Sequence, residues 1–217
     1  MIRGLNMHVT SLLLLLGLAS AAPGDFERGN ELLGQGRPAE AEIAFRSALA
    51  DDPKSASARA QVGLALIQQG KFDAAVAEIE AVLAVDPGNM AATWYLGIAR
   101  FKQRRDREAI NAFDAFLGRI DASSPQWVGA HWFRLTCYTA LLSSDGLTYD
   151  EVDRWLTSLD IYIATNAGDP DLPRLVGLRD YVVHNRPGKN VGTWQVVATD
   201  QQLADGILKL LSSDSVR

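Results

Sequence analysis

The sequence has very little of the chemistry that enzymes and metal sites need. It contains one cysteine, Cys137, and three histidines, of which only His131 and His184 lie beyond residue 21. A single cysteine cannot form a disulfide within the chain, so packing alone must stabilise the fold. The two histidines have no carboxylate or cysteine at ligand spacing, and Cys137 lies among apolar residues, where an inert buried thiol is expected. We therefore predict no catalytic residue, no metal and no cofactor.

The sequence has only one long apolar run, Leu12 to Leu18, and that run is too short to span a membrane, which takes about 20 residues. Arg3 precedes it and the small residues Ala19 to Ala22 follow it. This order is typical of a secretory signal peptide cleaved after Ala21. An uncleaved anchor is the alternative, but the short run disfavours it. We predict an exported protein without stable membrane insertion, and the absence of disulfides favours the bacterial periplasm.

Excess positive charge is lacking as well. The net charge is -5, and removal of residues 1 to 21 with Arg3 makes it -6. Such a chain does not favour phosphate backbones, so no nucleic-acid partner is expected. The segment Gly188-Lys189-Asn190 resembles a phosphate loop only superficially, because Val183 replaces the first glycine and Asn190 is neither Ser nor Thr.

One local basic cluster lies across a predicted turn. Two readings stay open for it: a solvated turn, or a contact for an acidic partner. The cluster comprises Arg100, Lys102, Arg104, Arg105 and Arg107.

What the sequence does contain is a period of 34 residues, which relates Gly29, Gly63 and Gly97. Each unit predicts two amphipathic helices, for example 57–69 and 72–85, the first ended by a glycine and the second stopped before a proline. Gly63 is expected to let the two helices of its unit approach closely, with Ala75 in the facing position. The same period relates Ala41, Ala75 and Ala109, then Phe45, Ile79 and Phe113, then Pro53, Pro87 and Asp121.

These columns resemble the tetratricopeptide repeat family. The resemblance implies an all-α, right-handed superhelical array of antiparallel helix pairs, an α-solenoid, with a role in protein or peptide recognition. After the signal peptide, the resemblance implies three repeats in residues 22–121 and a degenerate fourth in 122–165, whose register we expect to slip by about five residues at 122–126. Residues 166–217 form a C-terminal helical extension without repeat signature.

Within this extension we expect a helix at 172–185, a short extended piece at 194–197 and a final amphipathic helix after Thr199-Asp200. We predict that the final helix caps the fourth unit near Trp155 and Leu159. The alternative is that it folds back into the groove of the array. Its apolar stripe comprises Leu203, Ile207, Leu208 and Leu211.

The resemblance places the first helix of each pair on the concave side of the array, where a partner segment would bind. The expected groove is apolar, although an aromatic residue at helical spacing is core as often as ligand contact. The chaperone-binding subtype of the family uses a clamp of polar and basic residues, of which only Asn30 is matched here. The predicted groove residues are Phe26, Asn30, Leu64, Ile67, Trp94, Ile98, Phe101 and Phe133, with Leu33, Ala60 and Cys137 beside them.

These features predict a non-catalytic protein, a periplasmic adaptor or scaffold that binds a partner peptide or helix in an apolar groove. The alternative is a structural accessory subunit of an envelope complex, docked through its C-terminal extension. An enzyme is disfavoured, because residues 166–217 are too few to form a separate active-site domain.

Overall fold

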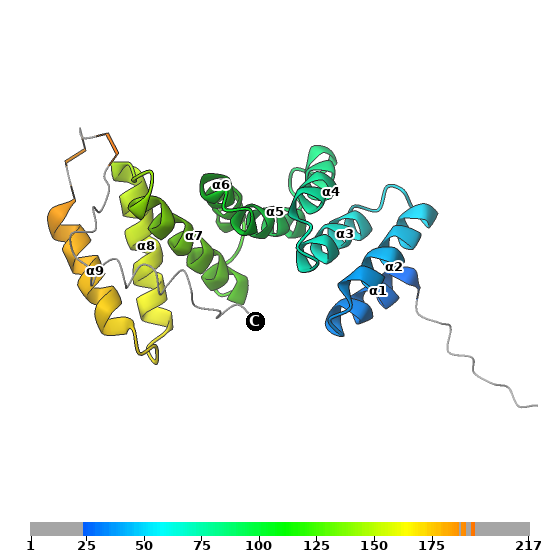
Figure 1. Ribbon diagram of the computed structural model, residues 1–217, viewed down its shortest axis with the longest axis horizontal. Coiled ribbons are helices and arrows are strands. Elements are labelled where there is room, and N and C mark those ends of the chain that lie inside the picture. Colours follow the sequence, from blue (N-terminus) through cyan, green and yellow to red (C-terminus); the bar gives the residue numbers. More distant parts are fainter. Residues whose placement is uncertain (1–23, 187, 190–191, 194–217) are drawn as a thin grey trace, which may run out of the picture.

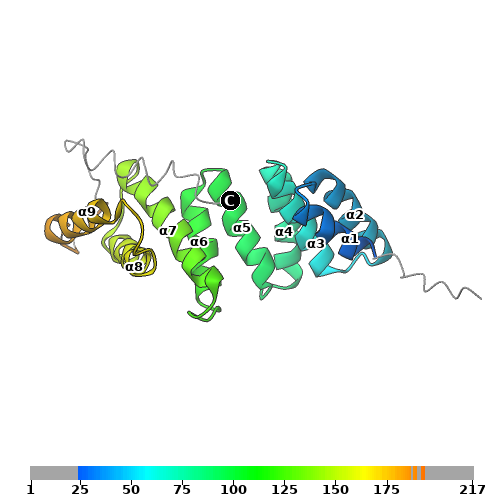
Figure 2. The same ribbon diagram turned by 90° about the horizontal axis from the view of Figure 1, so that it is seen from below.

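The computed structural model describes residues 24–186, 188–189 and 192–193, and every regular element in this part of the chain is a helix. The helices follow one another as antiparallel pairs along the long axis of the molecule (Figures 1 and 2). The predicted signal peptide, the extended piece at 194–197 and the final helix lie outside the described residues. The helices are α1 (Asp25–Gly34), α2 (Pro38–Asp51), α3 (Ala56–Gln68), α4 (Phe72–Val85), α5 (Met90–Lys102), α6 (Asp106–Leu117), α7 (Pro125–Ser143), α8 (Tyr149–Thr165) and α9 (Leu172–Asn185).

The turn inside each helix pair has the same backbone geometry. In each turn, one of the residues that follow the first helix adopts a positive φ. This residue is glycine in three of the four turns, since only glycine takes this conformation without strain. The third turn has an arginine at that place. The four residues are Gly36 (φ 69°), Gly70 (φ 75°), Arg104 (φ 60°) and Gly146 (φ 79°).

The glycines that recur every 34 residues, Gly29, Gly63 and Gly97, lie where the two helices of the first three pairs cross. A Cβ atom on Gly63 would lie 2.6 Å from Cγ1 of Ile79, and one on Gly97 would lie 2.6 Å from Cε1 of Phe113. Gly29 makes the corresponding approach to Phe45, at 2.4 Å. The nearest side chain to Gly63 is therefore that of Ile79 rather than Ala75, whose carbonyl oxygen lies 3.6 Å from the same point. The first helices α1, α3 and α5 thus need a glycine, because a large side chain occupies the crossing.

The fourth pair, α7 and α8, repeats this crossing without a glycine. Trp155 Nε1 donates a hydrogen bond to Thr139 Oγ1 at 2.9 Å, and the two residues are 16 apart, as are Gly97 and Phe113. Gly146 follows Arg104 by 42 residues rather than 34, so the register slips by eight residues and not by about five. The extra residues lengthen α7, which has 19 residues against 13 in α5.

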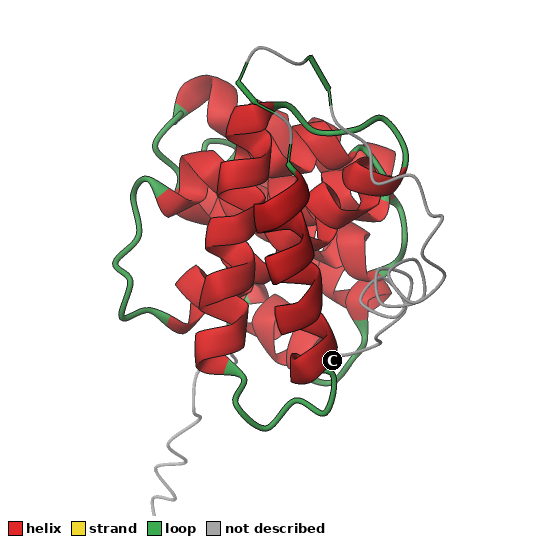
Figure 3. Ribbon diagram, turned by 90° about the vertical axis from the view of Figure 1, so that its left-hand side faces the viewer, coloured by secondary structure: helices red, strands yellow, loops and turns green. Residues whose placement is uncertain are grey.

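The core consists of two clusters that meet at α5. Ala92 and Ala99 of this helix belong to the N-terminal cluster, built on α1 to α5, while Trp94 and Phe101 pack on the C-terminal cluster, built on α6 to α9. The N-terminal cluster is rich in alanine and the C-terminal cluster in aromatic residues, so α5 joins two differently packed halves of one array. Figure 3 looks along this array from the α9 side.

Helix α9 covers the last repeat pair. Its buried side chains Leu175, Leu178 and Val182 belong to the same cluster as Trp155 and Leu159, which are fully buried. We predicted that the final helix at 203–211 would cover these two residues. That helix lies outside the described residues, and in the described part of the chain α9 packs against both of them.

Candidate interaction surfaces

Three columns of equivalent positions lie on the first helices α1, α3 and α5, and we call this set the first-helix face. Among the predicted groove residues, Asn30 is exposed, and five apolar or aromatic side chains are half-buried. Ile67 is only 8% exposed and belongs to the N-terminal cluster, so it packs in the core. The columns of the face are Phe26, Ala60 and Trp94, then Asn30, Leu64 and Ile98, then Leu33, Ile67 and Phe101.

An aromatic cluster holds α5 and α6 against α7. The rings of Phe113 and Phe133 stack with their centroids 4.9 Å apart and an interplanar angle of 6°. Trp94 meets Phe133 edge-on at 5.7 Å, and Phe101 meets it edge-on at 5.1 Å. Such ring pairs stabilise the contact beyond the area they bury. Trp94 and Phe101 therefore combine a packing role with the surface that they still expose.

The predicted groove residue in the fourth unit, Phe133, is 5% exposed and lies at the centre of this cluster. The eight-residue slip explains the difference, because the positions equivalent to Trp94 and Ile98 become Thr136 and Ala140. Both are buried, at 3% and 6% exposure. Among the residues whose burial the structure describes, the first-helix face is therefore accessible at α1, α3 and α5 but not at Thr136 and Ala140 of α7. The signal that would have corrected the register is Gly146, which marks the turn of the fourth pair.

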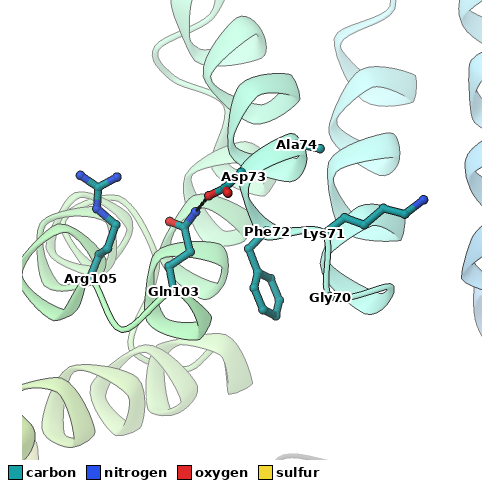
Figure 4. A pocket seen from close by; sticks show the side chains of 7 residues that line it. All are labelled: Gly70, Lys71, Phe72, Asp73, Ala74, Gln103 and Arg105. Atoms are coloured by element: carbon teal, nitrogen blue, oxygen red, sulfur yellow. Dashed lines mark hydrogen bonds between the residues drawn. The ribbon is translucent and has the colours of Figure 1, made fainter.

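Outside this face, one hollow of about 370 Å³ is lined by α4, α5 and α6, with Leu83, Leu96 and Ala112 among its residues. Another, of about 330 Å³, lies at the turns of the third and fourth pairs, with Arg104, Asp106 and Asp145 among its residues. A third, of about 550 Å³, lies at the turns of the second and third pairs (Figure 4). There Gln103 Nε2 donates a hydrogen bond to Asp73 Oδ1 at 2.5 Å and so joins the two pairs, while Lys71 and Arg105 point to opposite sides. These side chains do not converge on a common ligand position.

A buried polar network connects α6, α7 and α8. The guanidinium of Arg134 donates to Asp114 Oδ1 at 2.8 Å and to Ser158 Oγ at 2.9 Å. His131 Nδ1 lies 3.4 Å from the same Ser158 oxygen. Burial, together with the charge of Arg134, lowers the pKa of His131 to about 4. Arg154 completes the network, since it donates to Asp114 Oδ2 at 3.2 Å and its carbonyl accepts from Ser158 Oγ at 3.1 Å. This is the arrangement of a structural network rather than of an exposed acid–base pair.

This network predicts a pH dependence of stability. The folded state holds His131 neutral down to pH about 4, whereas the unfolded chain takes up a proton near the ordinary pKa of 6.5. The contribution of neutral His131 to the free energy of unfolding is therefore present above pH 6.5. It is lost as the pH falls from 6.5 towards 4, by no more than about 3 kcal/mol. Urea unfolding of wild type and His131→Gln across this range measures the difference. His184→Gln, on an exposed residue of α9, is the control, and equal pH slopes for all three proteins would refute the assignment.

Cys137 also lies in the interior, on α7. Burial raises the pKa of its thiol, and the neighbouring carboxylate of Asp106 raises it further. A thiol held in its protonated form is a poor nucleophile. Within residues 24–186, 188–189 and 192–193, no three His, Cys, Asp or Glu side chains gather into a potential metal site. None of the helices in the same part of the chain combines the length and apolarity that a membrane span requires.

Comparisons with known proteins agree with this architecture. Two family models described as tetratricopeptide repeat match residues 32–83 and 61–125. No curated protein matches the sequence. Among solved structures, MamA from Desulfovibrio magneticus RS-1 is similar with a TM-score of 0.58 and 16% identity, over 88% of this chain and 96% of that one.

Two further structures have comparable similarity. Another MamA crystal structure gives a TM-score of 0.55 at 17% identity, over 84% of this chain and 90% of that one. A tetratricopeptide repeat protein from Parabacteroides merdae gives 0.54 at 16% identity, over 86% and 70% of the two chains. At these identities the likeness concerns the fold alone, an all-α array of helix pairs.

Proposed function

Because residues 32–125 consist of tetratricopeptide repeats, we propose that this protein is a non-catalytic scaffold that holds a segment of a partner protein on its first-helix face. Repeats of this kind are protein-interaction modules, and stacking them produces an extended binding surface. The observation that carries the proposal is a set of apolar side chains that stay half-exposed at equivalent positions of three successive first helices. These are Phe26, Leu64, Trp94, Ile98 and Phe101.

The chemistry of this face defines the partner segment. Half-exposed aromatic and aliphatic side chains favour an amphipathic helix or an extended segment with apolar side chains at regular spacing. Asn30 is exposed beside them and offers an amide that can donate to and accept from a partner backbone. Because residues 1–21 resemble a secretory signal peptide, we propose that the partner is bound in the bacterial periplasm.

A second candidate function has its own observation. Helix α9 exposes three large apolar side chains, Val176 at 38%, Tyr181 at 39% and Val183 at 43%. Exposed apolar residues at the end of an array suit permanent docking, which would make the protein an accessory subunit held through its C-terminal extension. In that case variants of α9, and not of the first-helix face, would release the partner.

Leu64→Glu is expected to weaken partner binding about tenfold to a hundredfold. It replaces an apolar contact, whose burial contributes about 1.5–3 kcal/mol, with a charge at the centre of the face. Recovery of partner after crosslinking in the cells that make the protein measures the loss. Ile43→Glu, at a residue of α2 that is 70% exposed, is the matched control. Loss of partner with Val183→Glu but not with Leu64→Glu would favour the accessory subunit.

A further inference from the structure

Arg104 occupies the one turn position of the array where the chain is strained. Its φ of 60° lies in the left-handed region, and the equivalent turn residues Gly36, Gly70 and Gly146 are all glycine. A side chain in this conformation costs free energy that glycine would avoid. Residues held in strained conformations persist where another requirement outweighs the strain, and they are frequent at binding sites.

Inside the described part of the protein, the side chain of Arg104 has only an attraction without direct contact to the carboxylate of Asp106, whose pKa burial raises and the charge of Arg104 lowers in opposition. Arg104 is exposed, and no ion pair or side-chain hydrogen bond of its guanidinium exists within the described ranges. Its basic neighbours are engaged: Arg100 pairs with Glu80, Arg105 with Glu108, and Arg107 with Glu151. Lys102 is the other cation of this cluster without a carboxylate partner in the described part of the chain.

These two cations lie at the end of the first-helix face. Lys102 Nζ lies 5.9 Å from the centroid of the Phe101 ring, which belongs to that face. Arg104 follows Phe101 by three residues, in the turn that ends α5. A partner segment that contacts Phe101 and continues towards the turn therefore meets two positive charges in succession.

We propose that the turn between α5 and α6 is a docking point for acidic residues of the bound segment, with Lys102 and Arg104 as the charges that receive them. This inference rests on the proposed function and adds the chemistry of the partner: apolar side chains over Phe101, followed by carboxylates. Pairing with Arg104 takes place only in the complex. The free protein therefore retains the strain and an unpaired guanidinium.

Binding of a fluorescein-labelled peptide of ten glutamates, followed by anisotropy at low ionic strength, tests this docking point directly. The net charge of -5 disfavours general attraction of such a probe, so its binding reports a local basic site. We expect Arg104→Gly and Lys102→Gln each to weaken binding about twofold to fivefold, as for exposed ion pairs, and the double variant to weaken it further. Arg104→Lys should bind as wild type does.

A second readout separates binding from stability. Arg104→Gly relieves the backbone strain and should raise the melting temperature by roughly 2–4 °C while it weakens binding. Lys54→Gln removes an exposed cation elsewhere, between α2 and α3, and should change neither property. Failure of wild type to bind the probe, equal binding by Arg104→Gly, or an equal loss in Lys54→Gln would each overturn the proposal.

The two proposals fail differently. Leu64→Ala removes an apolar contact and leaves both cations in place, so it should reduce binding of the natural partner but not of the glutamate peptide. If Leu64 variants leave partner binding unchanged, the first-helix scaffold is wrong whatever the peptide does. If they weaken it and Arg104→Gly does not affect the peptide, only the docking point is wrong.

Discussion

Gly63→Leu should lower the free energy of unfolding by about 3 kcal/mol or more. Even a Cβ at this position would lie 2.6 Å from Cγ1 of Ile79, whose branched side chain is fully buried and cannot move aside. Overpacking of a close contact costs about 1–3 kcal/mol for added methylenes, and leucine adds a whole isobutyl group at a helix crossing. Urea unfolding followed by circular dichroism measures the change.

The control for this variant is Gly34→Leu, in the last turn of α1. A Cβ on Gly34 meets no atom within 4 Å, so the same substitution should be nearly neutral there. Ile79→Ala introduced together with Gly63→Ala should give less than the sum of the two single effects, because the smaller residue makes room for the new methyl group. A Gly63→Leu protein that unfolds like wild type would refute the crossing geometry of all three repeats.

Phe113→Ala should be comparably damaging, with a loss of about 3–5 kcal/mol, as for other buried aromatic residues. Phe113 is fully buried, fills the space left by Gly97, and stacks on Phe133 with centroids 4.9 Å apart. Its removal leaves a cavity where the third repeat meets α7. The half-buried Phe72, at the start of α4, is the control, and its alanine variant should lose clearly less.

Phe113→Ala should also show whether the aromatic cluster couples the stability of α6 to that of α7 and α8. Hydrogen exchange of Phe113→Ala should increase in α7 and α8 as well as in α6, because the aromatic cluster connects these helices. Exchange that increases only within α6 would mean that the cluster does not transmit stability between the two halves of the core.

The sequence pattern was sufficient for the helix pairs that keep the 34-residue period. Helix α4 begins and ends at the predicted residues, since glycine, proline and the apolar stripe mark its limits. Beyond the repeats, α9 also has the predicted bounds. The fourth pair was misplaced because Thr139 stands where glycine would have marked the crossing, and because the extra turns of α7 have no repeat signature. Hydrophobic spacing identifies a buried stripe but carries no information on how many residues have been inserted before it.

The candidate site was less predictable than the fold. Helical spacing grouped Trp94, Ile98 and Phe101, which are half-buried in the structure, but it could not tell that Phe133 and Ile67 are buried in the core. Burial at these positions depends on contacts between repeats that are distant in the sequence. The strain at Arg104 was also invisible, because an arginine gives no sequence signal for a left-handed turn.

A similar limit applies to the end of the array. Residues 172–185 and 199–211 both have the spacing of an amphipathic helix, and spacing alone does not say which of them packs on α8. The structure shows that α9 packs there through Leu175, Leu178 and Val182, while residues 199–211 lie outside the described part of the chain.

Site-specific photocrosslinking tests the proposed scaffold most directly. Benzoylphenylalanine would replace Asn30, which is exposed on the first-helix face, or in separate proteins Ile43 of α2 and Val183 of α9. Irradiation of cells that produce each protein should give a discrete adduct with a partner protein from position 30, and this adduct should disappear when Leu64→Glu is added. Adducts from position 43 or 183 alone, or a position 30 adduct that survives Leu64→Glu, would contradict partner binding on the first-helix face.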